Sequence, residues 1–351
     1  MSDSPKADGD FISQFNLERI KQGVVIFAAI SIITFTAIFL YTSTAETLKV
    51  WQSVDWTYLC LGLVFIFNEI FLGGLRNHIF MREFVPGISQ MVSIKANLAN
   101  IFMGAITPSQ SGGGPAQWYI FYRNGVQLSD IIGTSFYNWI SSIIFFPLSG
   151  AFALAIMNDK LPDGMVLYLT QFGFSVFTTL LIVIGIALFA PRVLDIILRG
   201  IVTIIRTLNT RWSTKIDELG QSGTQKLNEY KTKYVGLIKK KPHLMVYSFL
   251  LTVVLYFNKY LLAYVLLLAF HIDADFWTVI AIQAVLCLIL YFAPSPGGSG
   301  IAELSISALM ANIIDVYYIG SFTLLYRSFL IFVPAILGSY VLLRQISKEK
   351  T

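Results

Sequence analysis

Two short segments rich in glycine and proline interrupt long apolar stretches in this chain. Residues 108–117 read PSQSGGGPAQ, and residues 294–303 read PSPGGSGIAE, 186 positions further along without a gap. Proline removes an amide donor, and lipid offers no replacement hydrogen bonds, so a broken backbone at membrane depth must lie inside the protein or line a wet cavity. Such breaks at corresponding points of two halves are typical of a transporter's binding site.

The composition excludes an ordinary soluble domain. The 351 residues are 56% hydrophobic and 13% charged, with a mean hydropathy of +0.69, which indicates a polytopic membrane protein. Motifs of hydrolases, metalloproteases and nucleotide-binding loops are missing from the sequence, so we expect no enzyme activity and no cofactor. The basic segments are explained by the excess of Lys and Arg in cytoplasmic loops of membrane proteins, so no nucleic-acid partner is expected. A metal site is not expected either, because the three histidines stand far apart at His78, His243 and His271.

Six apolar segments are long enough to span a bilayer, which takes roughly 20 residues. They run approximately over 24–41, 56–75, 129–157, 165–189, 244–270 and 318–343. Two further segments, 91–122 and 277–313, are apolar but broken by the two motifs, and each arm is too short to cross alone. The sequence therefore predicts an all-α polytopic membrane protein with about six transmembrane helices and two broken re-entrant helical hairpins.

The order helix, helix, hairpin, helix occurs twice, and three crossings per half require that the second copy be inverted. FNE at 67–69 matches FNK at 257–259 with an offset of 190, and Tyr137-Asn138 matches Tyr326-Arg327 with an offset of 189. These matches predict an inverted-topology repeat. The predicted organisation is an N-terminal segment 1–23, a first repeat 24–157, a second repeat 165–343 and a tail 344–351.

Lysine and arginine predict the orientation, because cytoplasmic loops carry an excess of both. Every basic cluster falls on one side if both termini are cytoplasmic, in the cytoplasmic membrane of a bacterium or archaeon. The insertion 190–243 within the second repeat holds 11 basic and 4 acidic residues. It is either a solvated cytoplasmic helix pair or a surface that contacts anionic lipids.

A charge in an apolar segment is costly and marks a functional hypothesis, and four of the charged residues in these segments are singled out: Glu69, Lys259, Glu303 and Arg327. Glu69 and Lys259 occupy equivalent places in the two halves. We expect them to approach one another, either as a buried ion pair that fixes helix packing or as a gate that breaks during transport. Arg327 either pairs with Glu303 or binds a lipid phosphate with its planar guanidinium.

The two broken motifs are the candidate substrate-binding elements. The turn GGSG at 297–300 precedes a half-helix, and exposed amides at a helix N-terminus suit an anion. Glu303 either stabilises this helix start, binds an amine headgroup or carries a proton. The predicted substrate-binding set is Pro294, Gly297, Gly298, Ser299, Gly300, Glu303 and Arg327 from the second copy, and Ser109, Gly113, Gly114, Gln117 and Arg123 from the first.

The motifs resemble a known family. APSPGGSGIAE at 293–303, LLYRSFLIFVPAILG at 324–338 and TPSQSGGGPAQ at 107–117 are similar to the transmembrane flippase domain of the lysylphosphatidylglycerol synthase/flippase family. The resemblance implies a lipid flippase fold with re-entrant hairpins. Bifunctional members also carry a soluble aminoacyl-transferase domain after the membrane part, and this chain stops at Thr351, so that activity is not expected. The resemblance assigns the residues at the polar interruption of the family's apolar segments to Pro294, Gly297, Gly298, Gly300, Glu303 and Arg327.

The sequence thus predicts a transporter that moves a lipid between leaflets, with the headgroup in a polar central cavity. The expected partners are membrane lipids, either anionic or aminoacylated phospholipids or a polyprenyl-phosphate lipid, and a homo-oligomer is compatible with the sequence. Three alternatives stay open. They are an ion-coupled carrier of a small solute, an intramembrane enzyme that uses Glu303 as acid or base, and a membrane scaffold that transports nothing.

Overall fold

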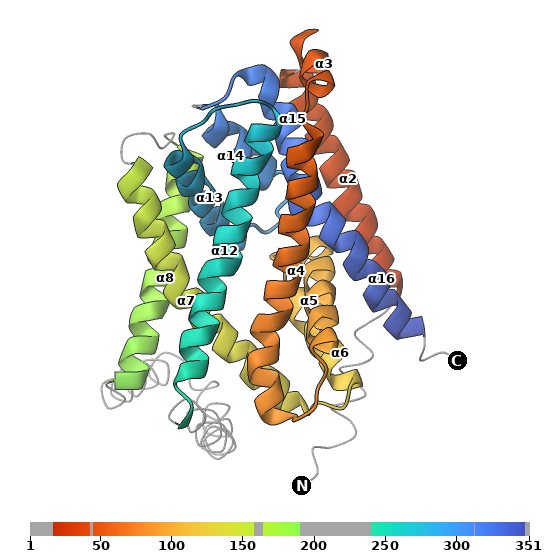
Figure 1. Cartoon of the computed structure of the whole chain (residues 1–351), viewed down its shortest axis with the longest axis vertical. Coiled ribbons are helices and arrows are strands. Elements are labelled where there is room, and N and C mark those ends of the chain that lie inside the picture. The colour runs from red at the N-terminus through yellow and green to blue at the C-terminus, as the bar shows by residue number, and fades with distance from the viewer. Residues whose placement is uncertain (1–16, 43–44, 158–163, 190–239, 312, 348–351) are drawn as a thin grey trace, which may run out of the picture.

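A computed structural model describes residues 17–42, 45–157, 164–189, 240–311 and 313–347 (Figure 1). All regular elements within these ranges are helices. They are α2 (Leu17–Thr42), α3 (Ala45–Gln52), α4 (Trp56–Phe84), α5 (Gln90–Ile106), α6 (Gly113–Arg123), α7 (Leu128–Met157), α8 (Met165–Phe189), α12 (His243–Ala269), α13 (Phe276–Tyr291), α14 (Ile301–Met310), α15 (Val316–Arg327), the π-helical η3 (Ser328–Phe332) and α16 (Val333–Ser347).

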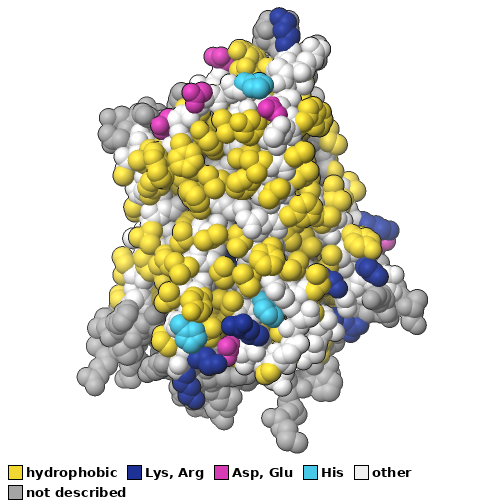
Figure 2. Space-filling view, in the orientation of Figure 1, with side chains coloured by type: hydrophobic (Ala, Val, Ile, Leu, Met, Phe, Trp, Pro, Cys, Tyr) yellow, Lys and Arg dark blue, Asp and Glu magenta, His cyan; other side chains and the backbone are white. Residues whose placement is uncertain are grey.

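Six helical runs of the described chain are long and apolar enough to cross a membrane. They are α2, α4, α7, α8, α12 and the continuous run α15–η3–α16. A broad apolar surface covers the middle of the molecule, and charged side chains gather toward its two ends (Figure 2). The protein is therefore an all-α polytopic membrane protein, as the sequence predicts.

Helix starts follow ordinary capping chemistry. Asp55 accepts a hydrogen bond from Thr57 N at 2.8 Å at the start of α4, and Asp275 accepts one from Thr278 N at 2.8 Å at the start of α13. Asp55 lies just before the membrane-spanning helix, and the hydrogen bonds from Thr57 hold the pKa of its carboxyl below the usual value.

Several predicted boundaries were too short. The helix predicted over 56–75 continues to Phe84, because polar residues such as Arg76 and Asn77 turn toward the protein interior and do not end the helix. Similarly, α2 begins at Leu17 within the predicted N-terminal segment, and α16 runs to Ser347 into the predicted tail. Residues 190–239, most of the predicted basic insertion, lie outside the described residues.

The two broken segments are helical hairpins that enter the molecule from opposite ends. In Figure 1, α5 and α6 rise from the lower end and turn in the middle, whereas α13 and α14 descend from the upper end. The two turns meet, since Pro108 and Pro296 form an isolated antiparallel β-bridge. This arrangement supports the interpretation as an inverted repeat with re-entrant hairpins.

The two turns share one backbone pattern at an offset of 188 residues. Ser111 N donates to Pro108 O at 3.1 Å, and Ser299 N donates to Pro296 O at 3.0 Å. Helix α6 begins at Gly113 and α14 begins at Ile301, which is the same offset.

The alignment of identical letters at an offset of 186 is therefore two residues out of structural register. It pairs Gln117 with Glu303, whereas the structure places Pro115 at the position equivalent to Glu303. Residue identities give the wrong register because the first turn has no glycine at two of the positions where the second turn has one. Ser109 and Gln110 have φ values of 51° and 55°, and the equivalent Gly297 and Gly298 have φ values of 58° and 70°.

Small residues allow the first hairpin to lie close to its neighbours. A Cβ atom added to Gly73 of α4 would lie 2.4 Å from Asn97 Nδ2 of α5, and one added to Gly338 of α16 would lie 2.2 Å from Leu98 O. Small residues at helix contacts are typical of membrane proteins, where close packing replaces the hydrophobic effect. These contacts hold α5 between α4 and α16 and bring Asn97 to the centre of the molecule.

Candidate functional site

Equivalent residues of the two halves meet where α4 crosses α12. Asn68 Nδ2 donates to Asn258 Oδ1 at 2.8 Å, and Lys259 Nζ lies 3.0 Å from Glu69 Oε1. Each pair is separated by 190 residues, which is the offset between FNE and FNK. A contact between equivalent residues is what a two-fold axis generates. The structure thus brings Glu69 and Lys259 together, as the sequence suggests.

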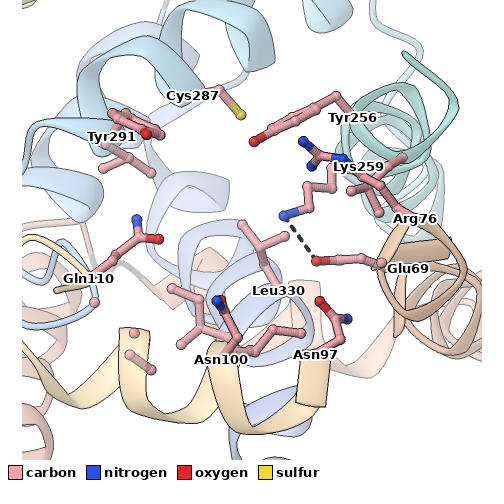
Figure 3. A pocket seen from close by; sticks show the side chains of 18 of the residues that line it. Glu69, Arg76, Asn97, Asn100, Gln110, Tyr256, Lys259, Cys287, Tyr291 and Leu330 are labelled. Carbon is pink, nitrogen blue, oxygen red and sulfur yellow. Dashed lines mark ion pairs between the residues drawn. The ribbon is translucent and has the colours of Figure 1, made fainter. Parts of the chain in front are cut away.

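A polar central cavity of about 280 Å³ surrounds this ion pair (Figure 3). It lies at the turns of both hairpins, and Gln110 of the first turn and Gly297 of the second both line it. Its polar lining includes Glu69, Arg76, Asn97, Asn100, Gln110, Tyr256, Lys259 and Tyr291. The volume is close to the lower end of the range for small-ligand pockets, which runs from about 300 Å³. The cavity therefore suits a headgroup and not a whole lipid.

A second cavity of about 440 Å³, called here the side cavity, adjoins the central one. The two share five lining residues: Gly73, Arg76, Asn97, Asn100 and Leu255. Phe136 and Trp139 of α7 also line the side cavity, and these two rings are 47% and 38% exposed at the molecular surface. The side cavity thus lies beside the central cavity, and two of its lining rings are exposed at the molecular surface.

Arg76 lies at the junction of the two cavities. Its Nη2 atom donates to Asn138 O and lies 2.8 Å from Ser142 Oγ, both in α7. Its Nε atom is buried and has no hydrogen-bond partner among the described residues. The predicted span 56–75 ends before Arg76, so the sequence placed this residue in a cytoplasmic loop. The rule that flags charges in apolar segments would have found it in the run IFLGGLRNHIF at 70–80.

A chain of amide side chains crosses the side cavity. Asn100 Nδ2 donates to Gln117 Oε1 at 3.2 Å, and Gln117 Nε2 donates to Asn77 Oδ1 at 3.2 Å. Asn138 Nδ2 donates to the same Asn77 oxygen at 2.8 Å. These four amides come from four different helices, α5, α6, α4 and α7, so the network fixes the lining of the cavity. Of these, only Gln117 is in the predicted substrate-binding set.

Gln110 is another lining residue outside the predicted set. Its side chain points into the central cavity, and its positive φ is uncommon for a residue other than glycine (Figure 3). Backbone strain of this kind clusters at functional sites. The sequence carries no signal for it, because the strain follows from the turn geometry and not from the residue type.

Arg327 and Glu303 form a closed network behind the second turn, and both side chains are fully buried. Arg327 Nε donates to Glu303 Oε1 at 3.0 Å, Nη1 donates to Gly297 O at 3.0 Å, and Nη2 donates to Ser299 Oγ at 3.3 Å. Glu303 Oε2 also accepts from Gly300 N at 2.6 Å. In this conformation neither charged group lines the central or the side cavity, and the pair holds the turn whose Gly297 lines the central cavity.

The remaining predicted binding residues are dispersed. Gly114 lines the side cavity, whereas Ser109 and Pro294 are exposed on the turns without lining either cavity. Gly113 packs against Asn100. The others outside the cavity linings are Gly298, Ser299, Gly300 and Arg123. Within the described ranges, no group of three or more His, Cys, Asp or Glu side chains is placed to hold a metal ion.

The fold and these cavities define a polytopic α-helical membrane protein with a polar interior site between two broken hairpins. The chain belongs to the family described as the lysylphosphatidylglycerol synthase TM region, whose model matches residues 23–338.

Two archaeal relatives carry the description UPF0104 membrane protein. One from Archaeoglobus fulgidus is 24% identical over 305 residues, covering 85% of this chain and 89% of the relative. One from Pyrococcus horikoshii is 22% identical over 327 residues, covering 89% of this chain and 94% of the relative. The similarity thus extends over more than four fifths of the chain.

Proposed function

We propose that this protein is a lipid transporter that moves a phospholipid or another phosphate-bearing lipid between the leaflets of a bilayer. The observation that carries the proposal is the pair of adjoining cavities with charged and amide side chains in their linings, the second of which is also lined by the surface-exposed Phe136 and Trp139. The headgroup passes through the cavities while the acyl chains stay in the surrounding lipid.

The proposal has a simple energetic basis. Moving a charged headgroup through hydrocarbon is costly because the group loses its hydration without gaining new partners. The lining of the central cavity offers charged and amide groups in place of water, notably Lys259, Asn97 and Asn100. The barrier to crossing falls by the free energy of these contacts. The membership in a family named for a lipid synthase supports the same substrate class.

The Glu69–Lys259 pair is the proposed gate. It links α4 to α12 and lies in the lining of the central cavity, where a phosphate can compete for Lys259. Tyr256 also contacts Lys259, since its ring centroid lies 5.4 Å from Nζ. Opening this pair would separate the two helices at the proposed axis and give access to the other leaflet.

We further propose that the protein is not an enzyme and that it resides in the cytoplasmic membrane of a bacterium or archaeon, with both termini in the cytoplasm. The enzyme alternative gave Glu303 the role of acid or base. That carboxylate is buried against Arg327 and lines neither the central nor the side cavity, so it would not contact a substrate bound in either one. The carrier of a small soluble solute is less well supported, because the side cavity is lined by two surface-exposed aromatic rings, Phe136 and Trp139, which suit contact with lipid.

The test is lipid exchange in liposomes that contain the purified protein. Fluorescent phosphatidylglycerol in the outer leaflet should become protected from a membrane-impermeant quencher much faster than in protein-free liposomes. Liposomes with an unrelated helical membrane protein are the control for nonspecific leakage. Exchange no faster than in that control, from protein that elutes as a monodisperse peak, would contradict the proposal.

A further inference from the structure

The charges that line the two cavities do not balance. The charged side chains among the described lining residues are Glu69, Arg76 and Lys259, so two positive charges face one negative charge. Glu69 is already paired with Lys259 at 3.0 Å. The excess positive charge therefore belongs to Arg76, at the junction of the cavities.

Arg76 is also oriented as an anion-binding residue. Asn138 O and Ser142 Oγ hold Nη2 from the side of α7 and fix the plane of the guanidinium group. Its Nε atom remains a buried donor without a partner among the described residues. A buried unpaired donor costs free energy, which an anionic oxygen would recover. The planar guanidinium group matches phosphate oxygens better than a lysine does.

The neutral lining favours the same kind of ligand. Asn97, Asn100 and Gln110 line the central cavity with neutral amide groups, and none of them adds a carboxylate that could hold an ammonium group. The one lining carboxylate, Glu69, is 5% exposed and bound to Lys259. A headgroup amine would have to compete with that lysine for its only anionic partner.

We infer that Arg76 binds the phosphate of the transported lipid and that the site selects headgroups of net negative charge over headgroups of net positive charge. A phosphodiester with one negative charge neutralises the excess charge of the lining. A lysyl-bearing phospholipid carries two ammonium groups at neutral pH against one phosphate, so it adds to that excess. The inference rests on the proposed function and narrows its substrate class to anionic phospholipids.

The first experiment measures both binding and exchange. In detergent, we expect short-chain phosphatidylglycerol to raise the thermal unfolding temperature at concentrations about tenfold lower than lysyl-phosphatidylglycerol does, because like charges repel in a partly buried site. Liposome exchange should show the same preference. Equal response to both lipids would overturn the inference while leaving the transport proposal in place. Inorganic phosphate that acts as strongly as the lipid would overturn it too, since the site would then bind a soluble anion.

Variants assign the preference to Arg76. Arg76→Gln should weaken phosphatidylglycerol binding about tenfold, as expected for a lost hydrogen bond to a charged group, and Arg76→Lys should recover part of it. Arg82→Gln is the matched control, because Arg82 is exposed on the same helix and lines neither cavity. Unchanged binding in a folded Arg76→Gln protein would overturn the assignment.

Gln110→Glu tests the charge balance without removing Arg76. Gln110 is exposed to the cavity, and glutamate has nearly the same size, so the turn should fold as before. The added carboxylate cancels the excess charge of the lining, and we expect the ratio of phosphatidylglycerol to lysyl-phosphatidylglycerol exchange to fall toward one. If this variant and the unaltered protein exchange no lipid, that result contradicts the transport proposal alone. The preference for one lipid over the other can then still be measured by binding. If the preference of the Gln110→Glu protein for binding phosphatidylglycerol over lysyl-phosphatidylglycerol is as strong as that of the unaltered protein, the inference is overturned.

Discussion

Two ionic pairs of the described residues, Glu303–Arg327 and Glu69–Lys259, differ in their surroundings. Arg327 and Glu303 are both fully buried, and every nitrogen of the arginine has a hydrogen-bond acceptor. The side chain of Lys259 is 27% exposed and faces a cavity, whereas that of Glu69 is 6% exposed. The first pair is thus arranged to hold a turn in one conformation, and the second can exchange partners with a ligand.

The Glu69–Lys259 pair leads to a test by charge exchange. Glu69→Gln or Lys259→Gln should destabilise the protein, because breaking a buried ion pair leaves a lone charge at a cost of ~3–5 kcal/mol. The partial exposure of Lys259 places the expected loss at the lower end. The combined change Glu69→Lys with Lys259→Glu should restore part of the stability, measured by thermal unfolding in detergent. Losses of stability that simply add in the exchanged protein would contradict an energetic coupling between the two residues.

The residues of the site differ in how well their positions can be predicted from the sequence. The pairing of Glu69 with Lys259 was predictable, because two opposite charges occupied matching tripeptides in apolar segments. Arg76 was not assigned, because the predicted helix ended one residue earlier. Gln110 was not predictable, because its place in the cavity depends on a left-handed turn that its sequence does not specify.

At the scale of elements, the hairpins are the unusual feature of the fold. The long helices were predictable from apolar runs to within a few residues, with α4 the main exception. The contact between the hairpin turns was not predictable from the sequence, because a bridge between Pro108 and Pro296 depends on how the two halves meet. The broken motifs place a loop in each half at the centre, but nothing in them specifies the register at which the loops pair.

The meeting of the turns predicts a reversible crosslink. Cysteines at Pro108 and Pro296, in a protein with Cys60→Ser and Cys287→Ala, should form a disulfide on mild oxidation. Residues paired across an antiparallel bridge have Cα atoms about 4.5–5.5 Å apart, within the range that a disulfide spans. If the turns separate during transport, lipid exchange should stop on oxidation and return with a reductant.

Each single-cysteine protein is the control for this crosslink, since oxidation should leave its exchange rate unchanged. Crosslinking is read as a mobility shift after cleavage at an engineered protease site in the 190–239 segment. A double-cysteine protein that never crosslinks would contradict the contact between the turns. Undiminished exchange in the crosslinked protein would show that the turns stay together throughout transport.

At the scale of the whole molecule, the two ends differ in charge. Basic side chains gather toward the lower end in Figure 2, where α4 ends and α12 begins in Figure 1. Lys241 lies there and pairs with Glu83 at 2.5 Å. Acidic residues precede α4, α13 and α15 at the opposite end, at Asp55, Asp275 and Asp315. Under the positive-inside rule, the basic end faces the cytoplasm.

This asymmetry predicts which loops are accessible from each face. Gln127 lies between α6 and α7 at the basic end, and Asp273 lies between α12 and α13 at the acidic end; both are exposed. In a protein with Cys60→Ser and Cys287→Ala, we expect Asp273→Cys to react with a membrane-impermeant maleimide on intact cells. Gln127→Cys should react only after the membrane is permeabilised. The reverse labelling pattern would show that the protein has the opposite orientation in the membrane, with the hairpins still entering from opposite sides. Reaction of both cysteines from one face would contradict the inverted arrangement, because each loop adjoins the hairpin that enters from its own side.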